Sequence, residues 1–215
     1  MGRLIVVEGI DGAGKRTLTD RLTAELTARG RSVARFGFPR YGVDEHADLV
    51  RAGLYGRLPA VARSVEAMAL LYALDRRAAA PELEKALAEH DVVLVDRFTA
   101  SNAAYGAARL HEAADGRFVA WVAELETELG VPVPDHQLLL SVPGDVAGAR
   151  AQARESAEPD RARDTYEADR GLQERAATVY RALADTGWRS AWTILDGAAE
   201  LDVAAVPRPA GVSAG

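Results

Sequence analysis

A glycine-rich turn between a buried strand and a helix is the feature that most constrains this fold. The apolar run in residues 3–8 predicts a fully buried parallel strand. Gly9-Ile-Asp-Gly-Ala-Gly14-Lys15 follows at once, and leucines at positions 18, 22 and 26 then predict a helix over residues 15–29. A strand, a glycine loop and a helix in this order place backbone N–H groups around a bound phosphate.

The turn fits the first seven positions of the Walker A pattern, whose loop holds the phosphates of a nucleoside triphosphate. Lys15 adds positive charge at the β and γ phosphates, and it is one of two lysines among 26 Lys and Arg residues. The pattern next requires Ser or Thr for magnesium, but Arg16 stands there and Thr17 follows. A strand-to-helix turn without a ligand is the alternative interpretation. The predicted ATP-binding residues are Gly9, Ile10, Asp11, Gly12, Ala13, Gly14, Lys15, Arg16 and Thr17.

Strand and helix patterns alternate along the rest of the chain. Strands are predicted over residues 32–38, 91–96, 137–142 and 191–195, a loop from Arg40, and helices over residues 61–80 and 81–89, the second beginning with Pro81. This alternation predicts an α/β fold, a doubly wound parallel sheet of about five strands flanked by helices. Ligands of such sheets bind at the carboxyl ends of the strands. Residues 1–206 are expected to form a single domain, and residues 207–215 a flexible tail.

Composition excludes several classes of function. Hydrophobic residues make up 48% and charged residues 27%, which is typical of a globular chain. The formal net charge of -6 argues against nucleic acid as a partner, because such proteins carry a basic face. No apolar run approaches the roughly 18 residues of a membrane span, and the first residues lead into a strand, not a signal peptide. The cytoplasm is the expected location.

Three classes of phosphate-loop protein then compete: a GTPase switch, an ATPase motor and a small-molecule kinase. GTPases read guanine with an Asn-Lys-x-Asp loop, but the second lysine, Lys85, lies in a Leu-Glu-Lys-Ala sequence. A transport ATPase needs a signature loop and a partner domain, which a chain of 215 residues does not show. The pattern therefore favours a kinase, which needs a pocket for the phosphoryl acceptor.

Candidate acceptor-binding groups follow the predicted strands and helix turns. Arg97 and Arg40 suit a phosphate, and Asn102 and Arg76 suit the edges of a base. A helix cap with a salt bridge is the alternative for Asp96-Arg97, and core packing is the alternative for Tyr72. The motifs are Phe38-Pro39-Arg40-Tyr41, Leu74-Asp75-Arg76, Asp96-Arg97-Phe98 and Ser101-Asn102-Ala103-Ala104-Tyr105.

The order of these motifs resembles the thymidylate kinase family over nearly the whole chain. The sequence looks most like the branch from high-GC bacteria, in which Gly-Lys-Arg-Thr closes the loop, so Arg16 fits as a branch trait. The resemblance implies the P-loop nucleoside monophosphate kinase fold with a lid at about residues 147–165. It also implies Mg²⁺, ATP and dTMP as ligands, and a homodimer whose candidate contacts are residues 61–80 and 117–129.

The resemblance implies a role for each matching residue. Tyr72 stacks on thymine, Arg76 and Asn102 hydrogen-bond the base, and Tyr105 crowds the 2′ position and so favours deoxyribose. Arg97 holds the acceptor phosphate. The implied dTMP-binding residues are Asp11, Phe38, Pro39, Arg40, Tyr41, Tyr72, Arg76, Arg97, Ser101, Asn102, Tyr105, Asp164 and Tyr166.

An arginine-rich stretch over residues 150–170 matches the lid of the family. Relatives without an arginine after the loop aspartate carry catalytic arginines in the lid; because Gly12 occupies that place here, Arg154 and Arg161 are implicated. A solvated helix face is the alternative for these arginines. The implied catalytic residues are Asp11, Lys15, Arg97, Arg154 and Arg161, and the implied metal ligands are Asp11 and Glu167.

The function expected from these observations is transfer of the γ-phosphoryl group of ATP to dTMP. Two alternatives stay open. One is a kinase of another nucleoside monophosphate or small molecule, and the other is a relative that binds nucleotide without turnover.

Overall fold

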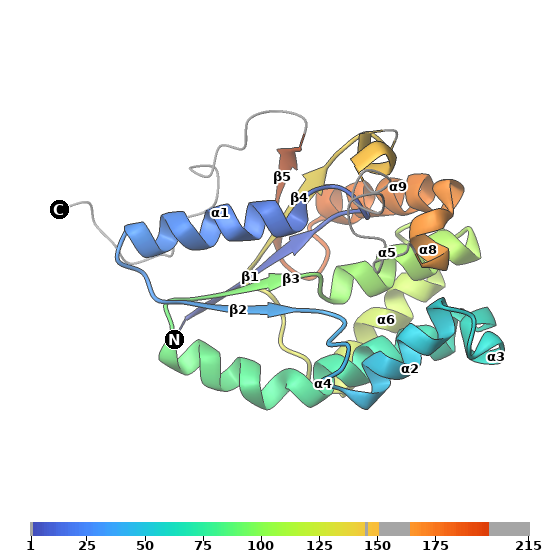
Figure 1. Ribbon diagram of the computed structural model, residues 1–215, viewed down its shortest axis with the longest axis horizontal. Helices are drawn as coiled ribbons and strands as arrows, with labels where there is room; N and C mark the ends of the chain where they lie inside the picture. The colour runs from blue at the N-terminus through green and yellow to red at the C-terminus, as the bar shows by residue number, and fades with distance from the viewer. Residues whose placement is uncertain (1, 145, 151–163, 198–215) are drawn as a thin grey trace.

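A parallel sheet of five strands lies at the centre of the fold, with helices on both faces (Figure 1). The structure is a computed structural model and describes residues 2–144, 146–150 and 164–197. The sheet order is β2–β3–β1–β4–β5, and Val7 of β1 lies opposite Asp96 of β3 and Leu138 of β4. The strands are β1 Arg3–Glu8, β2 Val33–Gly37, β3 Val92–Asp96, β4 His136–Ser141 and β5 Ala191–Asp196. The predicted fold class is confirmed.

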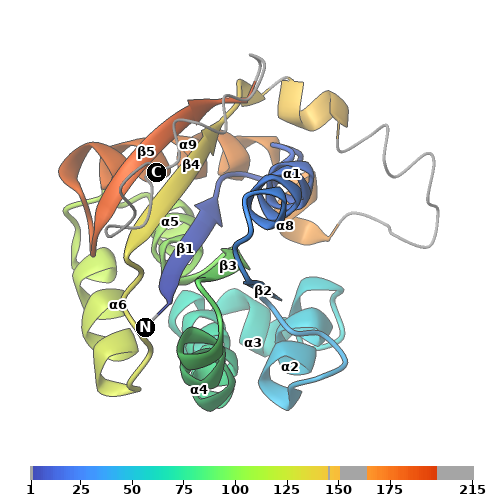
Figure 2. The same cartoon turned by 90° about the vertical axis from the view of Figure 1, so that its left-hand side faces the viewer.

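Alternate residues of β1 pack against opposite faces of the sheet, as in any strand buried on both sides. Leu4 and Val6 belong to a core cluster with α4, and Ile5 and Val7 to a second cluster with α1, α5 and α9. Figures 1 and 2 show α1 and α4 on opposite sides of the sheet. The helices are α1 Lys15–Ala28, α2 Glu45–Leu54, α3 Pro59–Arg63, α4 Val65–Glu89, α5 Thr99–Leu110, α6 Arg117–Glu128, α8 Thr165–Ala168 and α9 Arg170–Thr186.

The predicted break at Pro81 is wrong, because α4 runs through it without interruption. A proline inside a helix loses one backbone hydrogen bond. The turn around it is held by packing, since Ala79 and Leu83 are fully buried in the cluster formed with β1 and β3. Tertiary burial therefore outweighs the local preference that Pro81 expresses for a helix start.

The segment after Arg40 was expected to be a loop, but it contains α2 and α3. Asp44 caps α2 by accepting hydrogen bonds from the backbone N–H groups of His46 and Ala47. The helix then buries Val50 and Leu54 against Met68 of α4. The predicted helix over residues 61–80 begins later, at Val65, because Ser64 caps it.

Helix α6 lies close to α5 because Gly106 of α5 has no side chain. A Cβ atom at this position would stand 2.0 Å from Cε1 of Phe118, the second residue of α6, so the ring occupies that space. This contact places the inner face of α6 beside α4 and α5. No helix in the described part of the chain is both long and apolar enough to cross a membrane.

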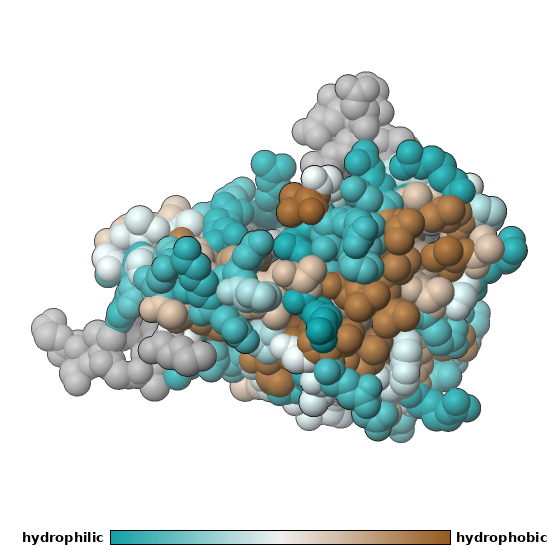
Figure 3. All heavy atoms as spheres, turned by 90° about the horizontal axis from the view of Figure 1, so that it is seen from below, coloured by the Kyte–Doolittle hydropathy of each residue, from teal (hydrophilic) through white to brown (hydrophobic). Residues whose placement is uncertain are grey.

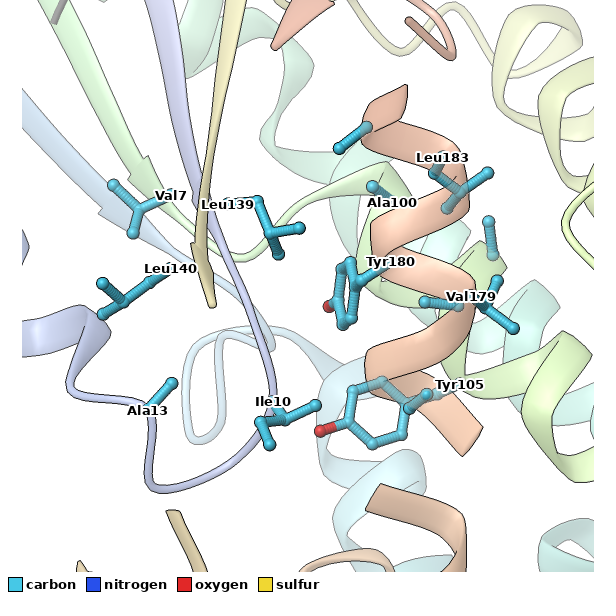
Figure 4. Close-up of a cluster of buried hydrophobic side chains, with 14 of the residues drawn as sticks. Val7, Ile10, Ala13, Ala100, Tyr105, Leu139, Leu140, Val179, Tyr180 and Leu183 are labelled. Carbon is cyan, nitrogen blue, oxygen red and sulfur yellow. The ribbon is translucent and has the colours of Figure 1, made fainter. Parts of the chain in front are cut away.

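The carboxyl ends of β1 and β3 meet the helices α5 and α9. Figure 4 shows Tyr105 and Tyr180 with their hydroxyl groups directed toward β1 and the loop that follows it. The carboxylate of Glu8, the last residue of β1, accepts hydrogen bonds from the hydroxyls of Ser101 (2.6 Å) and Tyr180 (3.0 Å) and from the backbone of Phe98. This buried network holds the end of β1 against α5 and α9, next to the glycine-rich loop.

Candidate active site

The glycine-rich turn forms a loop that leads directly into α1. Gly9 and Gly12 have φ angles of 145° and 76°, and a Cβ atom on them would meet the carbonyl oxygens of Leu140 at 2.7 Å and Ala147 at 2.1 Å. Helix α1 begins without a side-chain cap and without an acidic residue in its first turn. Its first N–H groups are therefore available to an anion, as the sequence predicts.

Lys15 extends from the first turn of α1 into this loop. Its ammonium group donates a hydrogen bond of 2.8 Å to the carbonyl of Ile10, and its side chain is 7% exposed. Burial and the nearby Arg97 lower its pKa to about 8, although Asp11 and Asp96 oppose this shift. A triphosphate bound in the loop would place further negative charge beside this ammonium group and so favour its charged form.

Asp11 lies at the centre of a polar cluster beside the loop. Its carboxylate forms an ion pair with Arg97 and accepts hydrogen bonds from Tyr105 (2.8 Å) and Gln173 (3.1 Å). Burial raises its pKa, but the charges of Arg97 and Lys15 and these hydrogen bonds bring it down to about 2. Asp11 is therefore ionised at neutral pH.

Arg97 joins the phosphate loop to the end of β3. Its φ angle of 64° is in the left-handed region, and its guanidinium also donates to the carbonyl of Gly9 at 3.2 Å. Burial alone lowers its pKa, but Asp11 raises it well above the usual value. The alternative of a helix cap with a salt bridge at Asp96-Arg97 does not describe this arrangement, because α5 has no side-chain cap and Arg97 pairs with Asp11.

A cavity of about 660 Å³ joins the phosphate loop to α4 and α5. One end holds the charged groups around Asp11, and the other holds aromatic and amide side chains of α4, α5 and the segment after β2. Most of the predicted site residues line it. Those are Asp11, Gly12, Gly14, Lys15, Arg16, Thr17, Phe38, Pro39, Tyr41, Tyr72, Arg76, Arg97, Ser101, Asn102, Tyr105, Asp164, Tyr166 and Glu167.

The end of the cavity away from the loop carries the predicted base-binding residues. Tyr72 packs against the cluster that α2 forms with Met68, as the packing interpretation predicts, and it also lines the cavity, where stacking on a base stays a prediction. Arg76 lies over the ring of Phe98 and forms a buried ion pair with Glu126 of α6. Asn102 donates to Glu126 as well, at 3.2 Å.

Arg40 does not line this cavity, contrary to the expectation that it binds phosphate. Its guanidinium pairs with the carboxylate of Asp75 at 2.7 Å and with that of Asp44 at 3.3 Å, and also donates to the carbonyl of Asp75. Asp75 is fully buried, so its carboxylate needs this cation for compensation. Arg40 instead holds the Phe38-to-Tyr41 segment against α4.

Residues at the end of the predicted lid and just after it reach the cavity from α8 and its cap. Asp164 caps this helix through the backbone N–H groups of Tyr166 and Glu167, and burial raises its pKa. Tyr166 stacks near Tyr105, with ring centroids 6.1 Å apart. The predicted arginines Arg154 and Arg161 lie outside the described residues. So do most of the predicted lid and the predicted tail.

The donor groups at the loop fit a magnesium ion bound with a nucleotide. Within the described ranges no cluster of three or more His, Cys, Asp or Glu side chains could hold a metal alone. Mg²⁺ needs no such cage, because it keeps water ligands and takes one or two carboxylates with the substrate phosphates. Asp11 and Glu167 both line the cavity, and buried Oδ1 of Asp96, another lining residue, has no hydrogen-bond partner among the residues that the structure describes.

Comparison with known proteins agrees with this geometry. A family model described as thymidylate kinase matches residues 7–204. The chain belongs to the thymidylate kinase family. It is 49% identical over 193 residues to the thymidylate kinase of Mycobacterium tuberculosis strain H37Rv, covering 89% of this chain and 90% of that protein.

More distant thymidylate kinases show the same extended similarity. The enzyme from Xanthomonas euvesicatoria pv. vesicatoria is 37% identical over 185 residues, covering 85% of this chain and 72% of that protein. The enzyme from Leifsonia xyli subsp. xyli is 35% identical over 187 residues, covering 85% of this chain and 82% of that protein. The resemblance to the thymidylate kinase family inferred from the motifs is thereby confirmed.

Sequence motifs missed two residues that organise the site in this member of the thymidylate kinase family. Gln173 of α9 accepts from the backbone N–H of Asp11 and donates to the Asp11 carboxylate and to the carbonyl of Tyr166. Glu8 holds Ser101 and Tyr180 at the base of the loop. Glu8 ends a buried strand, which is a usable signal, but Gln173 lies 162 positions from Asp11 and has none.

The lowered pKa of Lys15 predicts that ATP binding takes up protons near pH 8. Half of the unliganded molecules are charged at Lys15 at this pH, and the triphosphate favours the charged form. Binding should therefore take up about half a proton at pH 8 and weaken as the pH rises further. Calorimetric titrations in two buffers of different ionisation enthalpy measure this uptake.

The Lys15→Arg variant is the matched control for this titration, because its guanidinium stays charged across the whole range. Its binding of ATP should take up fewer protons than the binding of the unaltered protein. Equal uptake by both proteins would show that another group titrates.

Proposed function

We propose that this protein transfers the γ-phosphoryl group of ATP to the phosphate of dTMP, giving dTDP and ADP. The observation that carries the proposal is the single cavity that joins the phosphate loop to Tyr72, Arg76 and Asn102. Two nucleotides can enter such a site from opposite ends, so that their phosphates meet beside Arg97. The membership of the thymidylate kinase family supports the same reaction.

The transfer needs positioning and charge neutralisation more than proton transfer. An oxygen of the acceptor phosphate attacks the γ-phosphorus, and the bond from that phosphorus to the β–γ bridging oxygen breaks, releasing ADP. The attacking oxygen is already anionic, so no strong base is required. Lys15 is assigned to the donor phosphates and Arg97 to the acceptor phosphate. Asp11 holds Arg97 in place through the ion pair.

Two other groups complete this assignment. Arg16 and Arg150 both line the cavity, and Arg150 donates to the carbonyl of Ala13 in the loop at 3.3 Å. Either guanidinium can neutralise phosphate charge. Asp11 and Glu167 are proposed to hold Mg²⁺, which would supply further neutralisation of the phosphates when bound.

We assign to Tyr105 the discrimination between deoxyribose and ribose in the acceptor. Its hydroxyl is within hydrogen-bond distance of Asp11 and of Gln173 (3.0 Å), and its ring lies between Tyr166 and Tyr180. A side chain fixed on so many sides cannot move away from an additional hydroxyl group on the sugar. The proposal therefore includes a preference for deoxyribose.

A panel of monophosphates with ATP and Mg²⁺ tests the reaction. We expect the highest kcat/KM with dTMP, with dUMP lower by about tenfold or more for the lost methyl group, and with dCMP lower still. UMP compared with dUMP reports the effect of Tyr105. A coupled assay for ADP measures all of these rates.

Other outcomes of this panel would identify the alternatives. If kcat/KM were higher with dCMP or a purine monophosphate than with dTMP, that monophosphate would be identified as the acceptor in place of dTMP. Tight binding of ATP without transfer to any acceptor would indicate a nucleotide-binding relative that does not turn over.

We also infer a homodimer from the family resemblance. Leu70, within the candidate contact region of residues 61–80, is 40% exposed. Figure 3 shows apolar residues gathered on one face of the molecule. The contact itself stays a prediction.

A further inference from the structure

A buried carboxylate of α6 contacts both residues that are assigned to the base. Glu126 is 0% exposed, and its carboxylate forms an ion pair with Arg76, which is 2% exposed. One of its oxygens also accepts a hydrogen bond from Nδ2 of Asn102 at 3.2 Å. Glu126 does not line the cavity, so it acts on a ligand only through these two side chains.

The hydrogen bonds of Asn102 fix which end of its amide faces a ligand. Its nitrogen donates to the carbonyl of Ala69 at 3.0 Å and to Glu126. Both partners are acceptors without a hydrogen, so a reversed amide would place oxygen against oxygen at two contacts. Because both amide hydrogens are used, Asn102 can offer the cavity only its carbonyl oxygen, an acceptor.

Arg76 offers the complementary group. Its Nε and Nη2 atoms donate to the two oxygens of Glu126, with 3.1 Å for the Nε contact, which leaves the N–H groups of Nη1 for a ligand. The site therefore presents one acceptor and one donor side by side. A base that fits it must carry a ring N–H next to a carbonyl oxygen, as thymine and uracil do at N3 and O4.

Cytosine reverses this pattern, because it carries an acceptor at N3 and an amino donor at C4. Its binding would set acceptor against Asn102 and donor against Arg76, which leaves buried polar groups unpaired. A site built around such hydrogen bonds rejects a mismatched ligand strongly. Discrimination thus depends on the group that keeps Asn102 and Arg76 in these orientations.

We propose that Glu126 is the positioning residue that makes this site selective for 4-oxopyrimidines over 4-aminopyrimidines. The inference rests on the proposed function, because it assumes that a pyrimidine base lies beside Arg76 and Asn102. An uncharged amide at position 126 would itself carry donors. Nδ2 of Asn102 would then face an amide that carries hydrogens, and only the carbonyl of Ala69 would still hold the Asn102 amide in its orientation.

The Glu126→Gln variant tests the proposal through the ratio of kcat/KM for dTMP to kcat/KM for dCMP. We expect this ratio to fall by at least about tenfold, mainly through a higher KM for dTMP, while kcat for dTMP changes by less than about threefold. Glu126 contacts no group at the phosphate end, so kcat should be spared. Glu124→Gln is the matched control, since Glu124 is exposed on the same helix and loses the same charge.

A purely structural role for Glu126 would lower stability and leave the ratio within about twofold of the unaltered protein, and that result would overturn the proposal. If the Gln variant does not fold, as judged by circular dichroism, Glu126→Asp replaces it. That variant keeps the negative charge but shortens the side chain by one methylene, which withdraws the carboxylate from both Arg76 and Asn102, and the same fall in the ratio is expected. An unaltered protein that prefers dCMP, or uses neither substrate, would refute the proposed function instead.

Discussion

Replacing Lys15 by alanine is expected to lower kcat/KM for ATP by about a thousandfold or more while the protein stays folded. The ammonium group is the mobile positive charge of the loop, and its neutralisation of the triphosphate grows as the phosphoryl group moves. Removing it also removes a buried charge whose pKa is depressed by burial, so the free energy of unfolding should not fall. A coupled ADP assay measures the rate, and urea denaturation measures the stability.

Lys85 provides the control, because it is the other lysine of the chain. Its side chain is 74% exposed on α4, and its contact with Glu89 is a surface pair at 4.0 Å. The Lys85→Ala variant should therefore retain full activity and nearly full stability. A Lys15→Ala enzyme with more than about a tenth of the normal kcat/KM would contradict the role assigned to the loop lysine.

Replacing Arg97 by methionine is expected to lower kcat/KM for dTMP by about a thousandfold, the effect of losing an arginine that stabilises transferring phosphate. The side chain of methionine keeps much of the volume but has no charge. It also leaves Asp11 without its ion-pair partner in a largely buried position, so we expect lower stability as well, by up to about 3 kcal/mol.

The two effects of this substitution can be separated by a second change at Asp11. In the double variant Arg97→Met with Asp11→Asn, the unpaired carboxylate is gone, so stability should recover. Arg97→Lys keeps the charge without the planar fork and should be intermediate in rate. An Arg97→Met protein that keeps near-normal kcat/KM for dTMP at a temperature where it is folded would show that Arg97 serves the fold alone.

Much of the fold can be predicted from local patterns. The strands of the sheet are short apolar runs, and the glycine turn after β1 determines where the first helix starts. The errors come from segments where local signals and tertiary burial disagree. Pro81 signals a helix start but lies inside α4, and α2 was overlooked although Asp44 supplies an ordinary helix cap.

In the candidate site, too, local sequence patterns identify some residues and miss others. The residues assigned to a phosphate or a base stand in short motifs at strand ends or on helix turns, where their spacing can be recognised. Residues that hold those groups in place come from distant helices, as Gln173 and Glu126 do, and no local pattern marks them. Arg40 shows the reverse error, since its charge suggested a phosphate although a buried carboxylate already compensates it.

The close contact between the Phe118 ring and Gly106 has a consequence for substitutions at position 106. Gly106 borders the cavity, whereas Phe118 stands behind it at the start of the helix that carries Glu126. A single added carbon atom at position 106 would displace the ring and, with it, the start of α6. The position of the Glu126 carboxylate, which contacts Arg76 and Asn102, therefore depends on the volume of this one interhelical contact.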